Sequence, residues 1–253
     1  MFHTEVAEGV AVVTLDRPPV NAISDAWIAA FHAVLDRLEA RADWSVLHLR
    51  SALKVFAAGA DLAEMRTRLD SPGGIAAQLA AVRGYQALFA RIEALPHVTL
   101  AEIGGAALGG GFELALTCDL RLAAHEAKLG LPELRLGLLP GAGGTQRLTW
   151  LCGRSVSLRL ILGAEVLGGA EAERLGLVHW SVPAVELAAA AAATARRYAA
   201  LPAHAAAAAK ACIHLAADPA TDGFAAEIDR TGDLLRTERT QTLVAAFLDR
   251  AAR

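Results

Sequence analysis

Aromatic residues are scarce in this chain of 253 residues, since phenylalanine, tryptophan and tyrosine together make up 5% of it. Hydrophobic residues as a whole make up 55%, so alanine and branched aliphatic residues must fill the interior. A chain of this length can bury roughly three quarters of the surface that its unfolded form exposes. We therefore expect one large domain with a core of small side chains, which needs neither a disulfide nor a metal ion.

Cysteine is also scarce. The chain contains Cys118, Cys152 and Cys212, which are far apart and form no C-x-x-C pair. This spacing excludes the usual patterns of zinc binding and dithiol redox chemistry. We expect three reduced, buried side chains in a reducing compartment.

The chain has no large excess of positive or negative charge. The 24 basic and 27 acidic residues give a net charge of −3 and are interspersed along the chain. Such a balance gives no electrostatic footprint for nucleic acid or for an anionic membrane surface. We expect neither as a partner.

The sequence shows no targeting segment and no apolar run of membrane-spanning length. Residues 2–9 contain Glu5 and Glu8 where a signal peptide would be apolar. The alanine run at residues 188–193 is short and lies between Glu186 and Arg196. These features predict a cytoplasmic protein.

Several cofactor and catalytic motifs are absent. Residues 140–144 are rich in glycine, but the chain has no G-x-G-x-x-G and no G-K-[ST], so we do not expect this loop to bind a nucleotide. It also lacks the G-x-S-x-G of serine hydrolases, and its eight histidines lack metal-ligand spacing. We expect no metal ion and no cofactor.

Strand-like and helix-like segments alternate over most of the chain. Residues 10–15, 45–50, 98–103 and 120–123 read as strands, whereas residues 24–40 and 75–94 read as helices and another helix begins at Gly110. This alternation predicts an α/β core over residues 1–183. From residue 184 to residue 253 the pattern is helical only, with breaks at Pro202 and around Asp218 and Pro219. We interpret this part as a helical appendage.

Two glutamates are the strongest candidates for catalysis. Glu113 follows the glycines 109–111, and Glu133 follows Pro132. Alone, each has an ordinary explanation, because a Glu in the first turn of a helix suits the helix dipole and a Glu after proline is usually solvated. Glu113, however, precedes an apolar run, and a buried carboxylate needs a partner or a function. Two carboxylates that face each other can add or remove water.

The segment at residues 55–62 is a second candidate site. Its small residues after a strand let the backbone approach a ligand closely, and Asp61 can cap a following helix. A tight turn that requires Gly59 explains the same residues without any function.

Five segments together resemble the enoyl-CoA hydratase/isomerase, or crotonase, family over essentially the whole chain. They are LDRPPVNA (15–22), FAAGADLAEM (56–65), ALGGGFELALTCD (107–119), LGLPELRLG (129–137) and PGAGGTQRL (140–148). The resemblance implies a spiral of repeated ββα units followed by a helical trimerisation segment. It also implies a homotrimer or homohexamer that acts on an acyl-CoA thioester, with fatty-acid or branched-chain breakdown as a possible setting.

The resemblance also assigns roles to residues. It implies that Glu113 and Glu133 are the catalytic pair of a hydratase, and that the N–H groups of Ala58 and Gly110 form an oxyanion hole for the thioester oxygen. The residues that it places at the substrate are Ala22, Ala58, Gly59, Ala60, Asp61, Gly110, Gly141, Phe247 and Arg250. Coenzyme A would be part of the substrate.

The sequence departs from the family pattern in places, and alternatives stay open. Leu131 stands where many hydratases carry glutamine, and Arg250 where a lysine often meets the CoA phosphates. Both glutamates favour a hydratase, because family members that only isomerise a double bond generally lack one of them. An isomerase, another acyl-CoA dehydratase or lyase, and a thioester hydrolase are the alternatives within the same fold. A non-enzymatic or RNA-binding protein is more remote.

Overall fold

The computed structural model describes residues 1–217 and 220–251, and these fall into two compact units. The first unit is Met1–Ala200 and the second is Leu201–Arg253. The predicted break around Asp218 and Pro219 lies outside the described residues.

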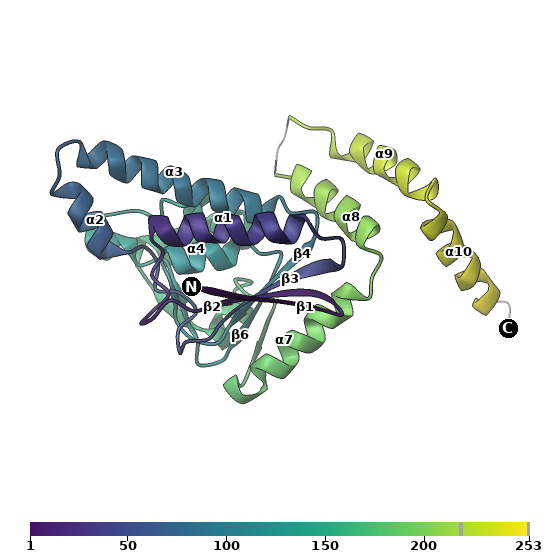
Figure 1. Cartoon of the computed structure of the whole chain (residues 1–253), viewed down its shortest axis with the longest axis horizontal. Coiled ribbons are helices and arrows are strands. Elements are labelled where there is room, and N and C mark those ends of the chain that lie inside the picture. Colours follow the sequence, from purple (N-terminus) through teal and green to yellow (C-terminus); the bar gives the residue numbers. More distant parts are fainter. Residues whose placement is uncertain (218–219, 252–253) are drawn as a thin grey trace. The chain divides into compact units, whose positions relative to one another are not determined.

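The first unit is built on a six-stranded sheet in the order β1-β2-β3-β4-β6-β9 (Figure 1). Its strands are β1 (Phe2–Ala7), β2 (Gly9–Leu15), β3 (Trp44–Ser51), β4 (Val98–Ile103), β6 (Leu120–Ala124) and β9 (Trp180–Val182). Strands β1 and β2 pair antiparallel, and every later pair in this sheet is parallel. Parallel pairing requires crossovers, which the intervening helices supply.

A second sheet of three short strands, in the order β5-β7-β8, lies in the same unit. These strands are β5 (Ala107–Leu108), β7 (Lys128–Gly130) and β8 (Val166–Gly168). After β4 the chain forms β5, and after β6 it forms β7, before a helix follows each time. The strand–strand–helix unit of the predicted spiral is therefore visible in the element order.

Most helices begin where the sequence predicts. Helix α1 (Asp25–Glu39) is capped by Ser24, whose hydroxyl accepts a hydrogen bond from the Trp27 N–H at 3.1 Å. Helix α2 (Leu62–Leu69) is capped by Asp61. The others in the first unit are α3 (Gly74–Glu93), α4 (Gly110–Leu116), the 3-10 helix η1 (Glu133–Leu136), α5 (Gly144–Leu162), α6 (Gly169–Arg174) and α7 (Ala184–Ala199).

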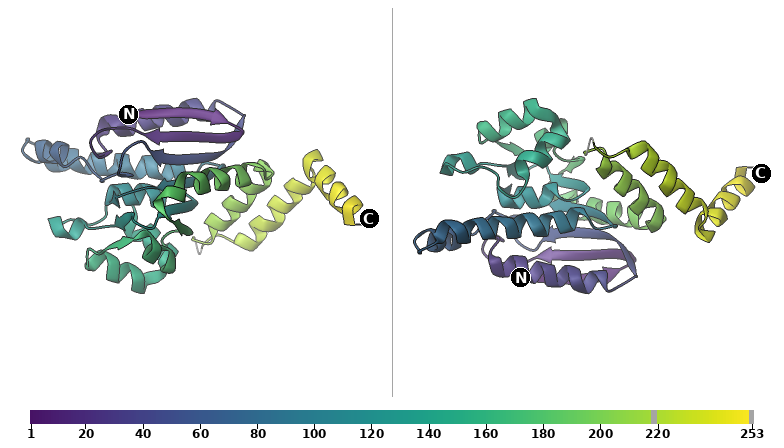
Figure 2. Two further views of the ribbon diagram at one scale, coloured as in Figure 1. Left: turned by 90° about the horizontal axis from the view of Figure 1, so that it is seen from below. Right: turned by 90° about the horizontal axis from the view of Figure 1, so that it is seen from above.

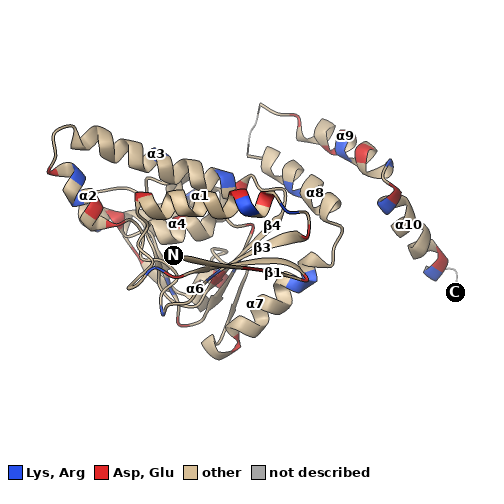
Figure 3. Ribbon diagram, viewed as in Figure 1, with Lys and Arg blue, Asp and Glu red and all other residues tan. Residues whose placement is uncertain are grey.

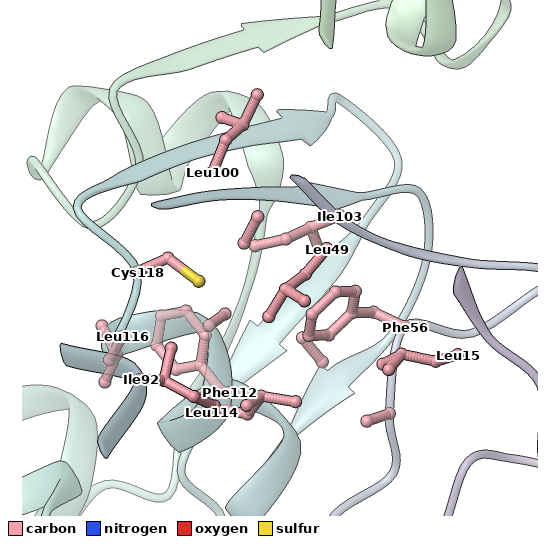
Figure 4. Packing of buried hydrophobic residues seen from close by; sticks show 14 of the residues in the cluster. Leu15, Leu49, Phe56, Ile92, Leu100, Ile103, Phe112, Leu114, Leu116 and Cys118 are labelled. Carbon is pink, nitrogen blue, oxygen red and sulfur yellow. The ribbon is translucent and has the colours of Figure 1, made fainter. Parts of the chain in front are cut away.

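The helices cover both faces of the large sheet. Helices α1 and α3 lie on one face and α7 on the other (Figures 1 and 2). Buried hydrophobic side chains, including those of Phe56, Ile92 and Phe112, pack together in the core of this unit (Figure 4). Helix α4 is buried along its whole length within this core, which holds its first turn in a fixed position.

Helix α7 belongs to the first unit, although the sequence pattern groups it with the C-terminal helices. It buries Leu187, Ala191 and Ala195 and packs on β2, β3, β4 and β6. The boundary between the compact units therefore falls after Ala200, whereas the change of sequence pattern places it after residue 183. The periodicity of hydrophobic residues in a sequence indicates that a segment is helical, but it does not indicate which other element packs on the apolar face of that helix.

The second unit consists of α8 (Ala203–Leu215), α9 (Gly223–Leu235) and α10 (Glu238–Ala251). Neither α8 nor α9 contains a buried residue, and the exposed apolar side chains include Ile213, Phe224 and Ile228. Both α9 and α10 carry basic and acidic residues (Figure 3). Among the described residues, no helix is both long and apolar enough to cross a membrane.

Candidate active site

The start of α4 is shaped by Gly109. This residue is the N-cap, and its φ of +53° with ψ of −129° is a conformation that residues with a side chain rarely adopt. Its carbonyl accepts the Glu113 N–H at 2.9 Å, which closes the first turn. The sharp turn leaves the N–H of Gly110, the first helical residue, without a hydrogen-bond partner among the described residues.

The Glu113 carboxylate is anchored through one of its two oxygens. Its Oε1 accepts the Ala142 N–H at 2.8 Å, from the loop before α5, and the Gly144 N–H at 2.7 Å, from the first residue of that helix. The side chain is buried, with 3% of its surface exposed. Its Oε2 makes no hydrogen bond within the described part of the chain. One oxygen is thus held in place while the other is available to a ligand.

Glu133 approaches the same helix start from η1. Its Oε1 lies 3.0 Å from the position that a Cβ on Gly109 would occupy. Its Oε2 is buried and has no hydrogen-bond partner among the described residues. A buried carboxylate oxygen without a donor is costly, so it is suited to contact a ligand or to carry a proton.

The pKa of Glu113 is raised to about 7, mainly by burial. The charge of Glu133 contributes to the rise, while the N–H groups of Gly144 and Ala142 and the charge of Arg147 oppose it. Burial also raises the pKa of Glu133. A glutamate whose pKa lies near neutral pH, as that of Glu113 does, can both accept and donate a proton at that pH. The structure therefore brings together the two residues that the sequence singles out.

Ala58 does not have the free N–H that the resemblance implies. Its N–H donates to the Val20 carbonyl at 3.0 Å, so the Ala58 peptide group is turned toward the loop before α1. The assignment of Ala58 as an oxyanion donor is therefore wrong. An amide already bonded to a backbone carbonyl cannot be aimed at a ligand without breaking that bond.

The N–H of Ala60, two residues later, is unpaired within the described residues. A Cβ placed on Gly110 would lie 3.6 Å from the Ala60 nitrogen. Gly59 makes this approach possible, because a Cβ there would lie 2.8 Å from the Leu108 carbonyl oxygen and 3.1 Å from the Gly110 nitrogen. Its φ of +96° also requires glycine. Two unpaired amides, those of Ala60 and Gly110, thus lie close together at the start of α4.

The loop around Ala22 is joined to the segment 56–61 by a ladder of backbone hydrogen bonds. The Ile23 N–H donates to the Gly59 carbonyl at 2.8 Å, and the Asp61 N–H donates to the Ile23 carbonyl at 2.9 Å. Arg17 donates to the Ala22 carbonyl and forms an ion pair with Asp61. Ala22, Gly59, Ala60 and Asp61 therefore form one continuous wall.

Comparison with known proteins gives the family. Residues 5–252 match the enoyl-CoA hydratase/isomerase family. A probable enoyl-CoA hydratase of Bacillus subtilis (strain 168) is 44% identical over 68% of this chain and 66% of its own length. The probable enoyl-CoA hydratase echA8 of Mycobacterium tuberculosis is 35% identical over 96% of this chain and 93% of its own length. The solved structure of an enoyl-CoA hydratase from Bacillus anthracis superposes with a TM-score of 0.90 at 32% identity, covering 98% of this chain and 96% of that one.

This chain belongs to the enoyl-CoA hydratase/isomerase family. The crotonase-like α/β fold that the five sequence segments predict is thereby confirmed. The segment shared with the Bacillus subtilis relative spans just under two thirds of that protein, whereas the match to the Mycobacterium tuberculosis relative is almost complete.

Three residues beside the site of this family member were assigned no role from the sequence. The guanidinium of Arg147 donates to both carboxylate oxygens of Glu93, at 3.1 and 2.8 Å, and to the Ala142 carbonyl at 3.0 Å. Gln86 donates to the Gly141 carbonyl at 2.7 Å. Glu93 and Gln86 lie on α3, far from this loop in sequence, so no local pattern could have revealed the contacts.

Phe247 and Arg250, the last two residues predicted to bind substrate, lie on α10 in the second unit. Phe247 is 65% exposed and helps to line an apolar groove of about 330 Å³ within that unit, together with Leu234, Leu243 and Val244. The Nε of Arg250 donates to the Ala246 carbonyl at 3.0 Å. Their roles toward a substrate stay predictions.

Among the described residues of this crotonase-like chain, no group of three or more His, Cys, Asp or Glu side chains is arranged to hold a metal ion. The expectation that the protein has no cofactor stays a prediction. The polar groups that face the site are carboxylates and backbone amides, which suit proton transfer and the binding of a negatively charged oxygen.

Proposed function

We propose that this protein is an enoyl-CoA hydratase, which adds water across the 2,3 double bond of a 2-enoyl-CoA thioester. The observation that carries the proposal is the arrangement of the two acids at the start of α4. Glu113 has one anchored and one free oxygen, and Glu133 offers a buried oxygen with no partner. A water molecule between these two free oxygens would be held by both.

The unpaired N–H groups of Ala60 and Gly110 support a thioester as the substrate. As water attacks C3 of a 2-enoyl thioester, negative charge develops on the thioester oxygen. Two fixed backbone donors stabilise that charge without reorganising, and the dipole of α4 adds to the effect at Gly110. We assign the oxyanion hole to Ala60 and Gly110 in place of Ala58 and Gly110.

The two acids would divide the proton transfers. Glu113 takes a proton from the water as its oxygen bonds to C3, and Glu133 delivers a proton to C2 as the enolate collapses. While Glu133 is protonated, it carries no charge that raises the pKa of Glu113, and the two N–H donors on Glu113 then favour the charged form of that carboxylate. The donor-free Oε2 of Glu133 favours the neutral form. Passing the proton from Glu113 back to Glu133, directly or through solvent, restores the starting state.

The remaining predicted contacts complete the proposal. The wall formed by Ala22, Gly59, Ala60 and Asp61 would line the path of the CoA thioester, and Gly141 would lie beside the acyl chain. Phe247 and Arg250 would contact the CoA moiety.

Hydration of crotonyl-CoA tests the function directly. The conjugated enoyl thioester loses its absorbance when water adds, and the product is a 3-hydroxyacyl-CoA. A parallel reaction with a 3-enoyl-CoA separates hydration from isomerisation, since an isomerase would create the conjugated absorbance instead. If a panel of 2-enoyl-CoA thioesters of different chain length and branching is not turned over, the proposal is wrong.

A further inference from the structure

Arg147 lies directly behind the loop that holds Glu113. Its Nη1 donates to the Ala142 carbonyl at 3.0 Å, and its backbone N–H donates to the Gly143 carbonyl at 3.0 Å. The amides on either side of these carbonyls, those of Ala142 and Gly144, are the two donors to Glu113 Oε1. The guanidinium therefore holds the peptide group between Ala142 and Gly143, which lies between the two peptide groups that donate to the carboxylate, and the Arg147 backbone N–H holds the second of these two.

Arg147 is itself held by a paired carboxylate. Its Nε and Nη2 donate to Oε1 and Oε2 of Glu93, the last residue of α3. The Arg147 side chain is 10% exposed and that of Glu93 is 30% exposed. A two-pronged contact of this kind restricts both position and rotation of the guanidinium, which a single surface ion pair does not.

We propose that Arg147, clamped by Glu93, is a positioning residue for Glu113. It holds the loop 142–144 whose N–H groups fix the carboxylate, and it places a permanent positive charge behind that carboxylate. The inference rests on the proposed role of Glu113 as the proton acceptor.

Two charged groups act on Glu113 from the elements packed around it. Glu133 on η1 raises its pKa, and Arg147 on α5 lowers it. Glu93 on α3 acts through Arg147, because its negative charge offsets part of the positive charge that Glu113 experiences. Removing the charge of Arg147 and removing the charge of Glu93 should therefore shift the pKa of Glu113 in opposite directions. If the two residues only stabilised the fold, no such opposite shifts would be expected.

The test is a titration of Glu113 that does not depend on turnover. Protein labelled with [5-¹³C]glutamate is titrated by carboxyl NMR, and the Glu113 signal is the one missing from Glu113→Gln. We expect Arg147→Gln to move the Glu113 pKa upward by roughly one unit and Glu93→Gln to move it downward by a smaller amount. Arg159→Gln is the matched control, since Arg159 is also on α5 and paired with Glu165 but half exposed, and it should change nothing.

Arg147→Lys separates charge from geometry. It keeps the positive charge, so the pKa of Glu113 should stay near its wild-type value. It loses the fork to Glu93 and the bond to Ala142, so kcat should fall by roughly tenfold or more while KM changes little. If Arg147→Gln does not fold, Arg147→Lys and Glu93→Gln carry the test.

The proposal is overturned if the pKa of Glu113 does not rise in a folded Arg147→Gln variant or does not fall in Glu93→Gln. It is also overturned if Arg147→Lys is fully active. A wild-type protein that turns over no enoyl-CoA would refute the proposed function alone, because the NMR titrations would still report whether Arg147 controls Glu113.

Discussion

The Nη2 of Arg17 and the Oδ2 of Asp61 lie 2.8 Å apart and form an ion pair across 44 residues of sequence. The same Asp61 carboxylate accepts the Ala63 and Glu64 N–H groups at the start of α2. Hydrogen bonding to Arg17 is the main reason that the pKa of Asp61 is lowered. One carboxylate therefore ties the loop before α1 to the wall of the candidate site.

We expect Asp61→Ala to lower the free energy of unfolding by about 1–2 kcal/mol, through loss of the helix cap and of the ion pair. Because the folded pKa is lowered, the stabilisation from the charge is present above the unfolded value near 4 and is lost as the pH falls through the folded value. Urea denaturation at fixed protein concentration, repeated from pH 7 to pH 3, measures both effects. Asp43→Ala is the control, because the exposed Asp43 is also paired with an arginine, Arg41, and its loss should leave stability unchanged.

Gly110→Pro should abolish hydration while leaving the fold intact. Proline lacks the N–H that we assign to the oxyanion hole, and position N1 of a helix is where proline is best tolerated. A loss of roughly 100-fold or more in kcat is expected. Gly110→Ala adds a Cβ, which would meet nothing closer than 3.6 Å, and retains the donor, so it should remain active. Circular dichroism checks the fold, and equal losses in both variants would assign the effect to bulk.

Glu113→Gln and Glu133→Gln should each lower kcat by roughly 100-fold or more, because each removes one proton transfer. The double variant should lose little more than either single one, since both acids serve one water. Glu165→Gln, on the surface, should be neutral. Near-normal turnover in either single variant would contradict the paired mechanism.

The pH profile follows from the raised pKa of Glu113. Because Glu113 must be ionised to accept a proton, kcat/KM should rise with pH up to about 7, and because Glu133 must be protonated to donate one, kcat/KM should fall again at higher pH. This acid limb is measured with crotonyl-CoA between pH 5 and pH 9. A limb near the ordinary glutamate pKa of about 4.3 would show that another group limits the reaction.

We expect a homotrimer or hexamer in solution, as the resemblance implies. In the second unit Phe224 is 84% exposed and Ile228 is 73% exposed. Apolar side chains in contact with water are unfavourable, and packing against other copies of the chain would bury them. Light scattering at micromolar concentration gives the mass. The double variant Phe224→Glu and Ile228→Glu should lower it, whereas Val185→Glu, at a position 92% exposed on α7, should not. A stable wild-type monomer would refute the assembly.

Much of the fold could be predicted because its signals are local. Ser24 and Asp61 cap the helices that follow them, and β4 coincides with the apolar run at residues 98–103. Strand β1 was not predicted, because its sequence FHTEVA lies at the sheet edge and buries little. An edge strand is defined by its partner, here β2, and leaves a weak pattern in sequence.

The candidate site was predictable in its acids and in the Gly110 amide, but not in its second amide. Glu113 and Glu133 stand out because a carboxylate in an apolar or glycine-rich setting is unusual. Which amide of the turn 58–61 is free depends on the carbonyl of Val20, far away in sequence, so residue types alone could not distinguish Ala58 from Ala60. The contacts of Arg147 could not be predicted for the same reason, because Glu93 reaches it from another helix.

The anchoring of Glu113 Oε1 by the loop 142–144 has a consequence for protein engineering. That loop begins beside Gly141, at the wall expected to meet the acyl chain. Any redesign that reshapes the loop to admit a different substrate will also move the two amides that hold the base. Substrate range and turnover are therefore coupled through one stretch of backbone.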